Sequence, residues 1–235
     1  MRSTQDSLIV ALDTDAMEAL RLAEAIRPKA RWVKVGMTLY YAEGPAIVDA
    51  LHALGYEVFL DLKLYDIPHQ VEGAAYQIAR TGVRMFTVHA SGGAEMMRAA
   101  VRGAAKGAAE AGHSPPDVLA VSVLTSFSEE ALAQTGITRG SGQQVELLVE
   151  LAKSAGVQGI VCSPLEAAQA RAILGPEALV VTPGVRPSGG SESDDQVRVA
   201  TPSRALESGA SHVVVGRPIT MAEDPLAAID GLFTD

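Results

Sequence analysis

Residues 59–68, Phe59-Leu60-Asp61-Leu62-Lys63-Leu64-Tyr65-Asp66-Ile67-Pro68, decide the fold because they place three charges at the end of a segment otherwise typical of a buried strand. Residues 57–60 are expected to form that strand. Side chains two apart on a strand share a face, so Asp61 and Lys63 should project side by side where it ends. Pro68 opens the next helix, since its fixed φ and missing N–H suit a first helical turn.

The three charges need partners, because an isolated carboxylate or ammonium group is expensive to bury. An alternating array of Asp61, Lys63 and Asp66 would supply the pairing, and the flanking carboxylates favour the ammonium form of Lys63. The array therefore predicts a general acid. The competing interpretation is a salt bridge at the rim of a barrel, with Asp66 only favouring the positive N-terminus of the next helix.

Eight apolar segments of buried-strand type recur along the 235 residues, and a helical pattern follows each of them. Strand–helix units spaced about 20 to 40 residues apart predict an α/β fold, a (β/α)8 TIM barrel forming a single catalytic domain over residues 1–235. A doubly wound open sheet is the alternative. Residues 38–54 are expected to form a helix that stops at Gly55. The expected strands are Leu8–Leu12, Trp32–Gly36, Glu57–Leu60, Met85–His89, Val118–Leu124, Gly159–Cys162, Leu179–Thr182 and His212–Gly216.

Composition narrows the classes of partner. The chain is 48% hydrophobic and 20% charged with a net charge of −9, and its Lys and Arg residues form no block, which argues against nucleic acid or an anionic membrane as partner. The single cysteine, Cys162, allows no internal disulfide and no cysteine-rich metal site. The first six residues lack the long apolar segment of a signal peptide, and no apolar run is long enough to cross a bilayer. A cytoplasmic protein is expected.

Polar residues stand at or just beyond the C-terminal ends of the expected strands, positions that converge on one mouth of a barrel, where such enzymes keep their active sites. The loops after the seventh and eighth strands commonly hold phosphate in this fold. Here they read Pro183-Gly184-Val185-Arg186 and Gly216-Arg217-Pro218; the glycines allow close backbone approach and the arginines can bind phosphate oxygens. Turn glycines beside solvated arginines are the alternative. The strand-end residues are Asp13, Lys34, Asp61, Lys63, His89, Thr125, Thr182 and Arg217.

The run Asp61-Leu62-Lys63-Leu64-Tyr65-Asp66-Ile67-Pro68 resembles the DxKxxDIP signature of the orotidine 5′-phosphate decarboxylase family, in its compact bacterial form. The resemblance implies a lyase that decarboxylates orotidine 5′-monophosphate to UMP, the last step of pyrimidine synthesis, without metal or organic cofactor. It also implies a homodimer. The match continues in order through Leu8–Asp13, Trp32–Gly36, Val88–Gly93, Leu124–Ser126, Thr182–Arg186, Asp195–Pro202 and Val214–Ile219.

The resemblance implies a role for each matching residue. Lys63 would protonate C6 of the pyrimidine as carbon dioxide leaves, and Asp61 would stand beside the departing carboxylate. Asp66 and Ile67 would enter the active site of the neighbouring subunit. Lys34 would bind ribose hydroxyls and also belong to the charge array. The other substrate contacts would be Asp13 on the ribose, Thr125 on the pyrimidine, Gln70 across the dimer interface, and Pro183, Arg186, Gln196, Gly216 and Arg217 toward the phosphate.

Three positions depart from the family pattern. Tyr65 stands where His is frequent, His69 where Asn is usual and Gln70 where Thr is usual. The family's Thr contacts ligand across the dimer interface. The amide of Gln70 could replace that hydrogen bond but needs more room.

Two other functions remain open. A phosphosugar decarboxylase or aldolase of the same superfamily shares the DxKxxD core but uses magnesium to stabilise an enediolate. A non-catalytic barrel that senses a phosphorylated ligand would explain the arginines but not a buried charge array. The Ile67-Pro68 continuation, Gln196 and residues 216–218 favour the nucleotide enzyme.

Overall fold

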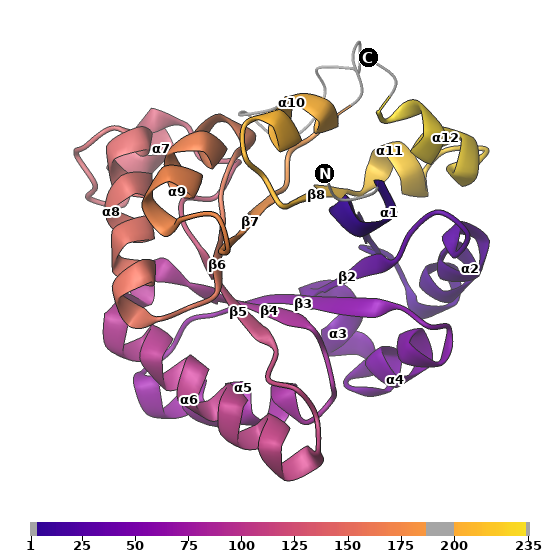
Figure 1. Ribbon diagram of the computed structural model, residues 1–235, viewed down its shortest axis with the longest axis horizontal. Helices are drawn as coiled ribbons and strands as arrows, with labels where there is room; N and C mark the ends of the chain where they lie inside the picture. The colour runs from indigo at the N-terminus through magenta and orange to yellow at the C-terminus, as the bar shows by residue number, and fades with distance from the viewer. Residues whose placement is uncertain (1–3, 187–199, 234–235) are drawn as a thin grey trace.

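Eight parallel strands close into a barrel with helices around it, as the computed structural model shows (Figure 1). The structure describes residues 4–186 and 200–233. Neighbouring strands pair in chain order, and β8 pairs with β1 to complete the circle. The predicted TIM barrel is therefore confirmed over the open sheet. The strands are β1 Leu8–Ala11, β2 Trp32–Gly36, β3 Glu57–Leu64, β4 Met85–His89, β5 Asp117–Val121, β6 Gly159–Val161, β7 Leu179–Thr182 and β8 His212–Val215.

The helices cover the outside of the barrel (Figure 1), and some of them begin at a side-chain cap. The carboxylate of Asp15, for example, accepts a hydrogen bond from the N–H of Glu18 at the start of α2. In the described part of the chain, no helix is long and apolar enough to cross a membrane. The helices are α1 Thr4–Ser7, α2 Ala16–Ile26, α3 Met37–Glu43, α4 Ala46–Ala53, α5 Pro68–Ala79, α6 Gly93–Ala111, α7 Glu129–Gln134, α8 Ser141–Ala155, α9 Ala167–Leu174, α10 Pro202–Glu207, α11 Arg217–Thr220 and α12 Pro225–Gly231, with 3-10 turns η1 Ala90–Gly92 and η2 Pro164–Glu166.

The single helix expected over residues 38–54 is wrong, because two helices, α3 and α4, occupy this stretch. The break falls at Gly44 and Pro45. Gly44 has a φ of 62°, in the left-handed region that glycine enters without a steric cost. Pro45 has no N–H to continue the hydrogen-bond ladder of α3, so a new helix starts after it.

Two strand ends differ from the prediction by more than one residue, and those of β1, β6 and β8 fall one residue earlier than predicted. β3 runs on to Leu64 instead of stopping at Leu60, with a register shift against β4. β5 ends at Val121 instead of Leu124, because its partners end there: Val121 pairs with the last residue of β4 on one side and the last residue of β6 on the other. Beyond that point no neighbouring strand remains to hold an extended backbone.

Residues in the strands alternate between two cores. One set packs between the barrel and its helices, and the other fills the barrel interior. Trp32, Phe59 and Met85 belong to the interior layer, and the residues two positions further along β2, β3 and β4 are polar or charged. Along β2, β3 and β4, the barrel interior is therefore apolar at the level of Trp32, Phe59 and Met85 and polar nearer the C-terminal ends of the strands. The buried interior residues are Ile9, Ala11, Phe59, Met85, Leu119, Val121, Val161, Val181 and Val214.

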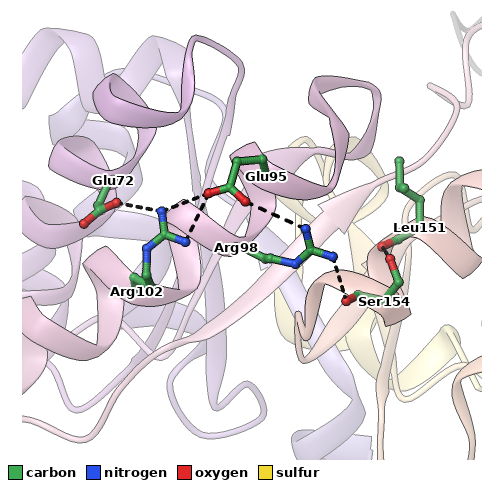
Figure 2. Close-up of polar contacts among 6 residues, drawn as sticks. All are labelled: Glu72, Glu95, Arg98, Arg102, Leu151 and Ser154. Atoms are coloured by element: carbon green, nitrogen blue, oxygen red, sulfur yellow. Dashed lines mark hydrogen bonds and ion pairs between the residues drawn. The ribbon is translucent and has the colours of Figure 1, made fainter.

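An ion pair links the outer helices α5 and α6, and a hydrogen bond links α6 to α8, as Figure 2 shows. Arg102 on α6 lies 3.0 Å from Glu72 on α5 and 3.2 Å from Glu95 of its own helix. Arg98 approaches Glu95 at 3.7 Å and donates to the backbone carbonyl of Ser154 on α8 at 3.4 Å. These side chains are largely exposed, so each pair contributes little to stability.

Candidate active site

A cavity of about 560 Å³ opens at the end of the barrel where the strands finish. Its wall combines charged side chains with apolar ones from β5, β6 and β8, among them Val121, Val161 and Val214. A small polar ligand with one flat apolar face would match such a lining. The sequence-predicted residues that line it are Asp13, Lys34, Asp61, Lys63, Thr125, Pro183, Arg186, Gly216 and Arg217.

Four charged side chains on one side of the cavity form a chain of alternating sign. Lys63 Nζ lies 2.9 Å from Asp61 Oδ2, and Lys34 Nζ lies 3.7 Å from the same oxygen. Lys34 also contacts Asp13 Oδ1 at 2.8 Å. Lys34 and Asp61 are nearly buried, with side-chain exposures of 10% and 12%, whereas that of Lys63 is 29%. The ammonium of Lys63 thus stands at the more open end, where a ligand can reach it.

Asp61 is ionised because of its neighbours. Burial would raise the pKa of this carboxyl, but the charges of Lys34 and Lys63, together with hydrogen bonds from Lys63 and Thr87, hold the pKa below its ordinary value. A carboxylate is therefore kept in the cavity wall at neutral pH. Negative charge on a ligand placed against Asp61 would be repelled, and charge developing beside Lys63 would be stabilised.

Gly36, the last residue of β2, leaves the room that the charged chain requires. A Cβ at this position would lie 2.6 Å from Asp13 Oδ1 and 3.2 Å from Lys34 Nζ. The absence of a side chain thus lets Asp13 close over Lys34. We did not predict this residue from the sequence, where it reads as an ordinary strand-ending glycine.

The corners after β7 and β8 lie on the same cavity. Pro183, Arg186, Gly216 and Arg217 line it, which brings two guanidinium-bearing residues to one mouth in a chain of net charge −9. The N–H of Arg186 donates a hydrogen bond to the carbonyl of Ala200 at 3.0 Å. This bond joins the chain after β7 to the chain just before α10. Gln196, which the resemblance places at the phosphate end, lies outside the described residues.

Asp66, Ile67 and Gln70 do not line the cavity of the described chain. Asp66 is exposed, and its carboxylate accepts a hydrogen bond from the N–H of Ile67 at 2.6 Å. Ile67 is 63% exposed. Within the described part of one chain, Lys63 forms an ion pair with Asp61 and not with Asp66, so the alternating array extends toward Lys34 instead.

Two other strand-end residues lie beside the cavity wall rather than on it. His89 packs its ring against Tyr65, with ring centroids 5.7 Å apart. Thr182 is fully buried, and its hydroxyl donates to the carbonyl of His212 at 3.4 Å. Buried Thr87 on β4, which is not among the residues predicted from the sequence, contacts both Asp61 and the backbone of Lys63. Its only sequence signal is a hydroxyl in an otherwise apolar strand.

The side chains of the described residues are poorly arranged to bind a metal ion. Among residues 4–186 and 200–233, no group of three or more His, Cys, Asp or Glu side chains gathers in a way that could hold one. Asp61, the most buried carboxylate of the cavity, already has one oxygen bonded to Thr87 and the other to Lys63. A cation at Asp61 would have to displace an ammonium group.

The sequence matches the family model described as "Orotidine 5'-phosphate decarboxylase / HUMPS family" over residues 6–232. It is 49% identical over 224 residues to the orotidine 5'-phosphate decarboxylase of Anaeromyxobacter sp. (strain K), covering 95% of each chain. It is 48% identical over 231 residues to that of Parasynechococcus marenigrum, covering 97% of this chain and 93% of the relative. The crystal structure of orotidine 5'-phosphate decarboxylase from Lactobacillus acidophilus superposes with a TM-score of 0.84 at 39% identity, covering 97% of both chains.

Proposed function

The chain belongs to the orotidine 5′-phosphate decarboxylase / HUMPS family, and from this premise we infer that it is a lyase converting orotidine 5′-monophosphate to UMP and carbon dioxide, the last step of pyrimidine synthesis. One observation carries the inference to the site. The Lys63–Asp61 pair, 2.9 Å apart, and the two arginine-bearing corners line a single cavity. That cavity therefore offers a cation and a carboxylate at one side and phosphate-binding groups at the other.

Loss of carbon dioxide from C6 of the pyrimidine leaves an electron pair on a carbon without a conjugated sink. We propose that the ammonium of Lys63 stabilises that charge and transfers its proton to C6 as the bond to the carboxylate breaks. The products are carbon dioxide, UMP and a neutral amine, which solvent reprotonates. Asp61, kept ionised by its neighbours, stands beside the departing carboxylate and disfavours its charge in the ground state.

Binding energy from the rest of the nucleotide supports this step. Asp13 and Lys34 lie next to each other and suit ribose hydroxyls, and Thr125 faces the same cavity from the loop after β5. Arg186, Gly216 and Arg217, with Gln196, would hold the phosphate. Contacts remote from the reacting carbon can be used to position the pyrimidine against Lys63.

The proposed assembly is a homodimer in which Asp66, Ile67 and Gln70 reach the neighbouring active site. Support comes from exposure: Tyr41, Tyr65 and Ile67 are 72%, 63% and 63% exposed in the single chain. Large apolar side chains left exposed on the segments that follow β2 and β3 are typical of an interface. We also propose that the reaction takes place in the cytoplasm, in keeping with a nucleotide substrate and a single buried cysteine, Cys162.

The test is to incubate the purified protein with orotidine 5′-monophosphate in excess chelator and to follow the ultraviolet spectrum. Conversion to UMP is expected, because the proposed chemistry uses only side chains. Lys63→Ala should fold and still bind UMP, yet lose nearly all turnover, on the order of 1000-fold or more. Activity that disappears in chelator would favour a magnesium-dependent phosphosugar enzyme, and an unchanged substrate spectrum with wild-type protein would favour a non-catalytic binding protein.

A further inference from the structure

β3 is irregular where it carries Asp61 and Lys63. Leu60 pairs with Phe86 and Leu64 pairs with Val88, so the stretch between them on β3 is longer than the stretch it faces on β4. Lys63 absorbs the excess with a φ of 52°, the only positive φ of a non-glycine residue in the described part of the chain. A left-handed conformation is unfavourable for a residue with a Cβ, so something must hold it there.

Thr87 is the residue of β4 that faces this bulge. Its hydroxyl accepts a hydrogen bond from the backbone N–H of Lys63 at 2.8 Å and donates one to Asp61 Oδ1 at 2.9 Å. The side chain is fully buried. Because one contact consumes the oxygen as acceptor and the other consumes its proton, the hydroxyl has a single orientation.

The two contacts of Thr87 complement the Lys63–Asp61 pair. Thr87 occupies Oδ1 of Asp61, which leaves Oδ2 for the ammonium groups of Lys63 at 2.9 Å and Lys34 at 3.7 Å. It also anchors the backbone from which the Lys63 side chain extends. The Thr87 hydroxyl therefore fixes both partners of the ion pair: it orients the carboxylate of Asp61 and it positions the backbone of Lys63.

We propose that Thr87 is a positioning residue, which holds the bulge of β3 so that Lys63 and Asp61 meet the reacting carbon in the correct geometry. The inference rests on the proposed function, since it concerns the geometry of that reaction. Thr87 contacts Lys63 and Asp61 but does not itself line the cavity. It therefore acts through these two residues and not on the substrate. Displacement of a catalytic group by about 1 Å costs on the order of 100-fold in rate.

Thr87→Val tests this, because it keeps the shape of the side chain and removes the hydroxyl. We expect kcat to fall by about 10- to 100-fold with KM changed by no more than a few-fold, since the phosphate and ribose contacts are remote. Thr87→Ser should retain activity within a few-fold. The acid limb of kcat/KM should move to higher pH in Thr87→Val, because the pKa of Asp61 loses one of the hydrogen bonds that lower it.

Thr81→Val is the matched control. The hydroxyl of Thr81 donates to the carbonyl of Ile78 at 2.7 Å at the end of α5, remote from the cavity, so the same chemical change should leave kcat and its pH profile as in the wild type. If Thr87→Val does not fold, Thr87→Ala against Thr87→Ser makes the same comparison. Wild-type kcat and pH profile in Thr87→Val, or equal losses in the Val and Ser variants, would overturn the proposal.

Amide hydrogen exchange separates this inference from the proposed function. The N–H of Lys63 should exchange faster in Thr87→Val than in the wild type by about 10-fold or more, and as slowly as the wild type in Thr87→Ser. A wild-type protein that leaves orotidine 5′-monophosphate unchanged would reject the function. An active wild type whose Lys63 amide is indifferent to the Thr87 hydroxyl would reject the positioning role alone.

Discussion

Asp61 joins the two ammonium groups of the cavity, because its Oδ2 lies 2.9 Å from Lys63 Nζ and 3.7 Å from Lys34 Nζ. Removing one partner from such a buried group leaves the other charge uncompensated, which is costly. Asp61 is thus needed for the stability of the charged chain as well as for its chemistry. The geometry favours a carboxylate at this position over a neutral isostere, even apart from any role in decarboxylation.

At the phosphate end, Arg217→Ala should weaken catalysis of the intact nucleotide. A hydrogen bond to a charged group is worth about 1.5–3 kcal/mol, so kcat/KM for orotidine 5′-monophosphate should fall by about 10- to 100-fold. Orotidine, which lacks the phosphate, should react equally slowly with variant and wild type. Decarboxylation of both substrates measured with both proteins gives the comparison, and equal losses for the two substrates would contradict a phosphate role.

His89 should make folding stability depend on pH. Burial, with a smaller contribution from the charge of Lys63, lowers the pKa of His89 below 6.5. Between 6.5 and that lower value the unfolded chain binds a proton that the folded chain does not, so the free energy of unfolding falls as pH drops. The pKa of His52 is also lowered, by burial first, and acts in the same direction.

His89→Gln should therefore show a smaller loss of unfolding free energy between pH 7.5 and pH 5.5 than the wild type. Urea denaturation at both pH values and one fixed protein concentration measures the difference. His52→Gln is the parallel variant and should reduce the loss independently, since the two rings lie in different parts of the chain. A pH dependence identical in His89→Gln and wild type would show that burial of His89 has no effect on its titration.

Individual charges were predictable from the sequence, whereas their neighbours were not. Lys34, Asp61 and Lys63 stand out because charges interrupt apolar strands, and the structure brings all three into one cavity wall. Gly36 and Thr87 carry no such signal. Gly36 matters because a Cβ there would lie 2.6 Å from Asp13 Oδ1, and Thr87 because its hydroxyl lies 2.9 Å from Asp61 Oδ1. In both cases the partner is distant in sequence, and a linear pattern does not report such distances.

At the scale of elements, α5 and α6 approach each other more closely than side chains would allow. A Cβ on Gly103 would lie 2.1 Å from the carbonyl oxygen of Glu72, and one on Gly107 would lie 2.1 Å from that of Tyr76. The two glycines of α6 thus let its backbone rest on that of α5. Since α5 follows directly from the end of β3, this contact also supports the loop that carries Asp66.

Gly103→Ala should destabilise the protein by about 1–3 kcal/mol, because the added methyl group forces α5 and α6 apart. Gly142→Ala in the first turn of α8 is the control, since nothing lies within 4 Å of its Cβ and alanine favours helix, so its stability should stay within about 1 kcal/mol of the wild type. Chemical denaturation of both variants gives the two values. A Gly103→Ala protein as stable as Gly142→Ala would mean that the helices can separate without loss.

Elements were predicted where the hydrophobic pattern had one interpretation. Seven of the eight strand starts agree with the structure, because apolar runs follow turn or loop residues, as at Trp32 and Met85, and β5 starts one residue early at Asp117. The errors come from partners that only the fold supplies. β5 ends early because β4 and β6 end beside it, and β3 continues past Leu60 because β4 still pairs with Leu64. The adjacent Gly44 and Pro45 indicate a helix break by their backbone chemistry, but apolar residues at helical spacing on both sides favoured one continuous helix.

At the scale of the whole molecule, closure of the barrel brings residues from both ends of the chain to one mouth. β1 pairs with both β2 and β8, so Asp13 lies on the same cavity as Lys34 and Arg217. A cation-lined cavity in a chain of net charge −9 directs an anionic ligand to one place. The exposed stretch from Tyr65 to Ile67 stays outside that cavity, and in the proposed homodimer it would reach the cavity of the neighbouring subunit.

Subunit mixing tests whether Asp66 acts in the neighbouring site. Lys63→Ala and Asp66→Asn should each be nearly inactive alone. In a mixed dimer, one of the two sites would combine an intact Lys63 with an intact Asp66, so equal amounts that reassort at random should recover about a quarter of wild-type activity. Lys63→Ala mixed with Asp61→Asn is the control. These two residues form an ion pair within one chain, so every site keeps one defect and no activity should return. Recovery equal to this control would place Asp66 in its own subunit's site, and an Asp66→Asn protein with wild-type activity would place it outside the reaction.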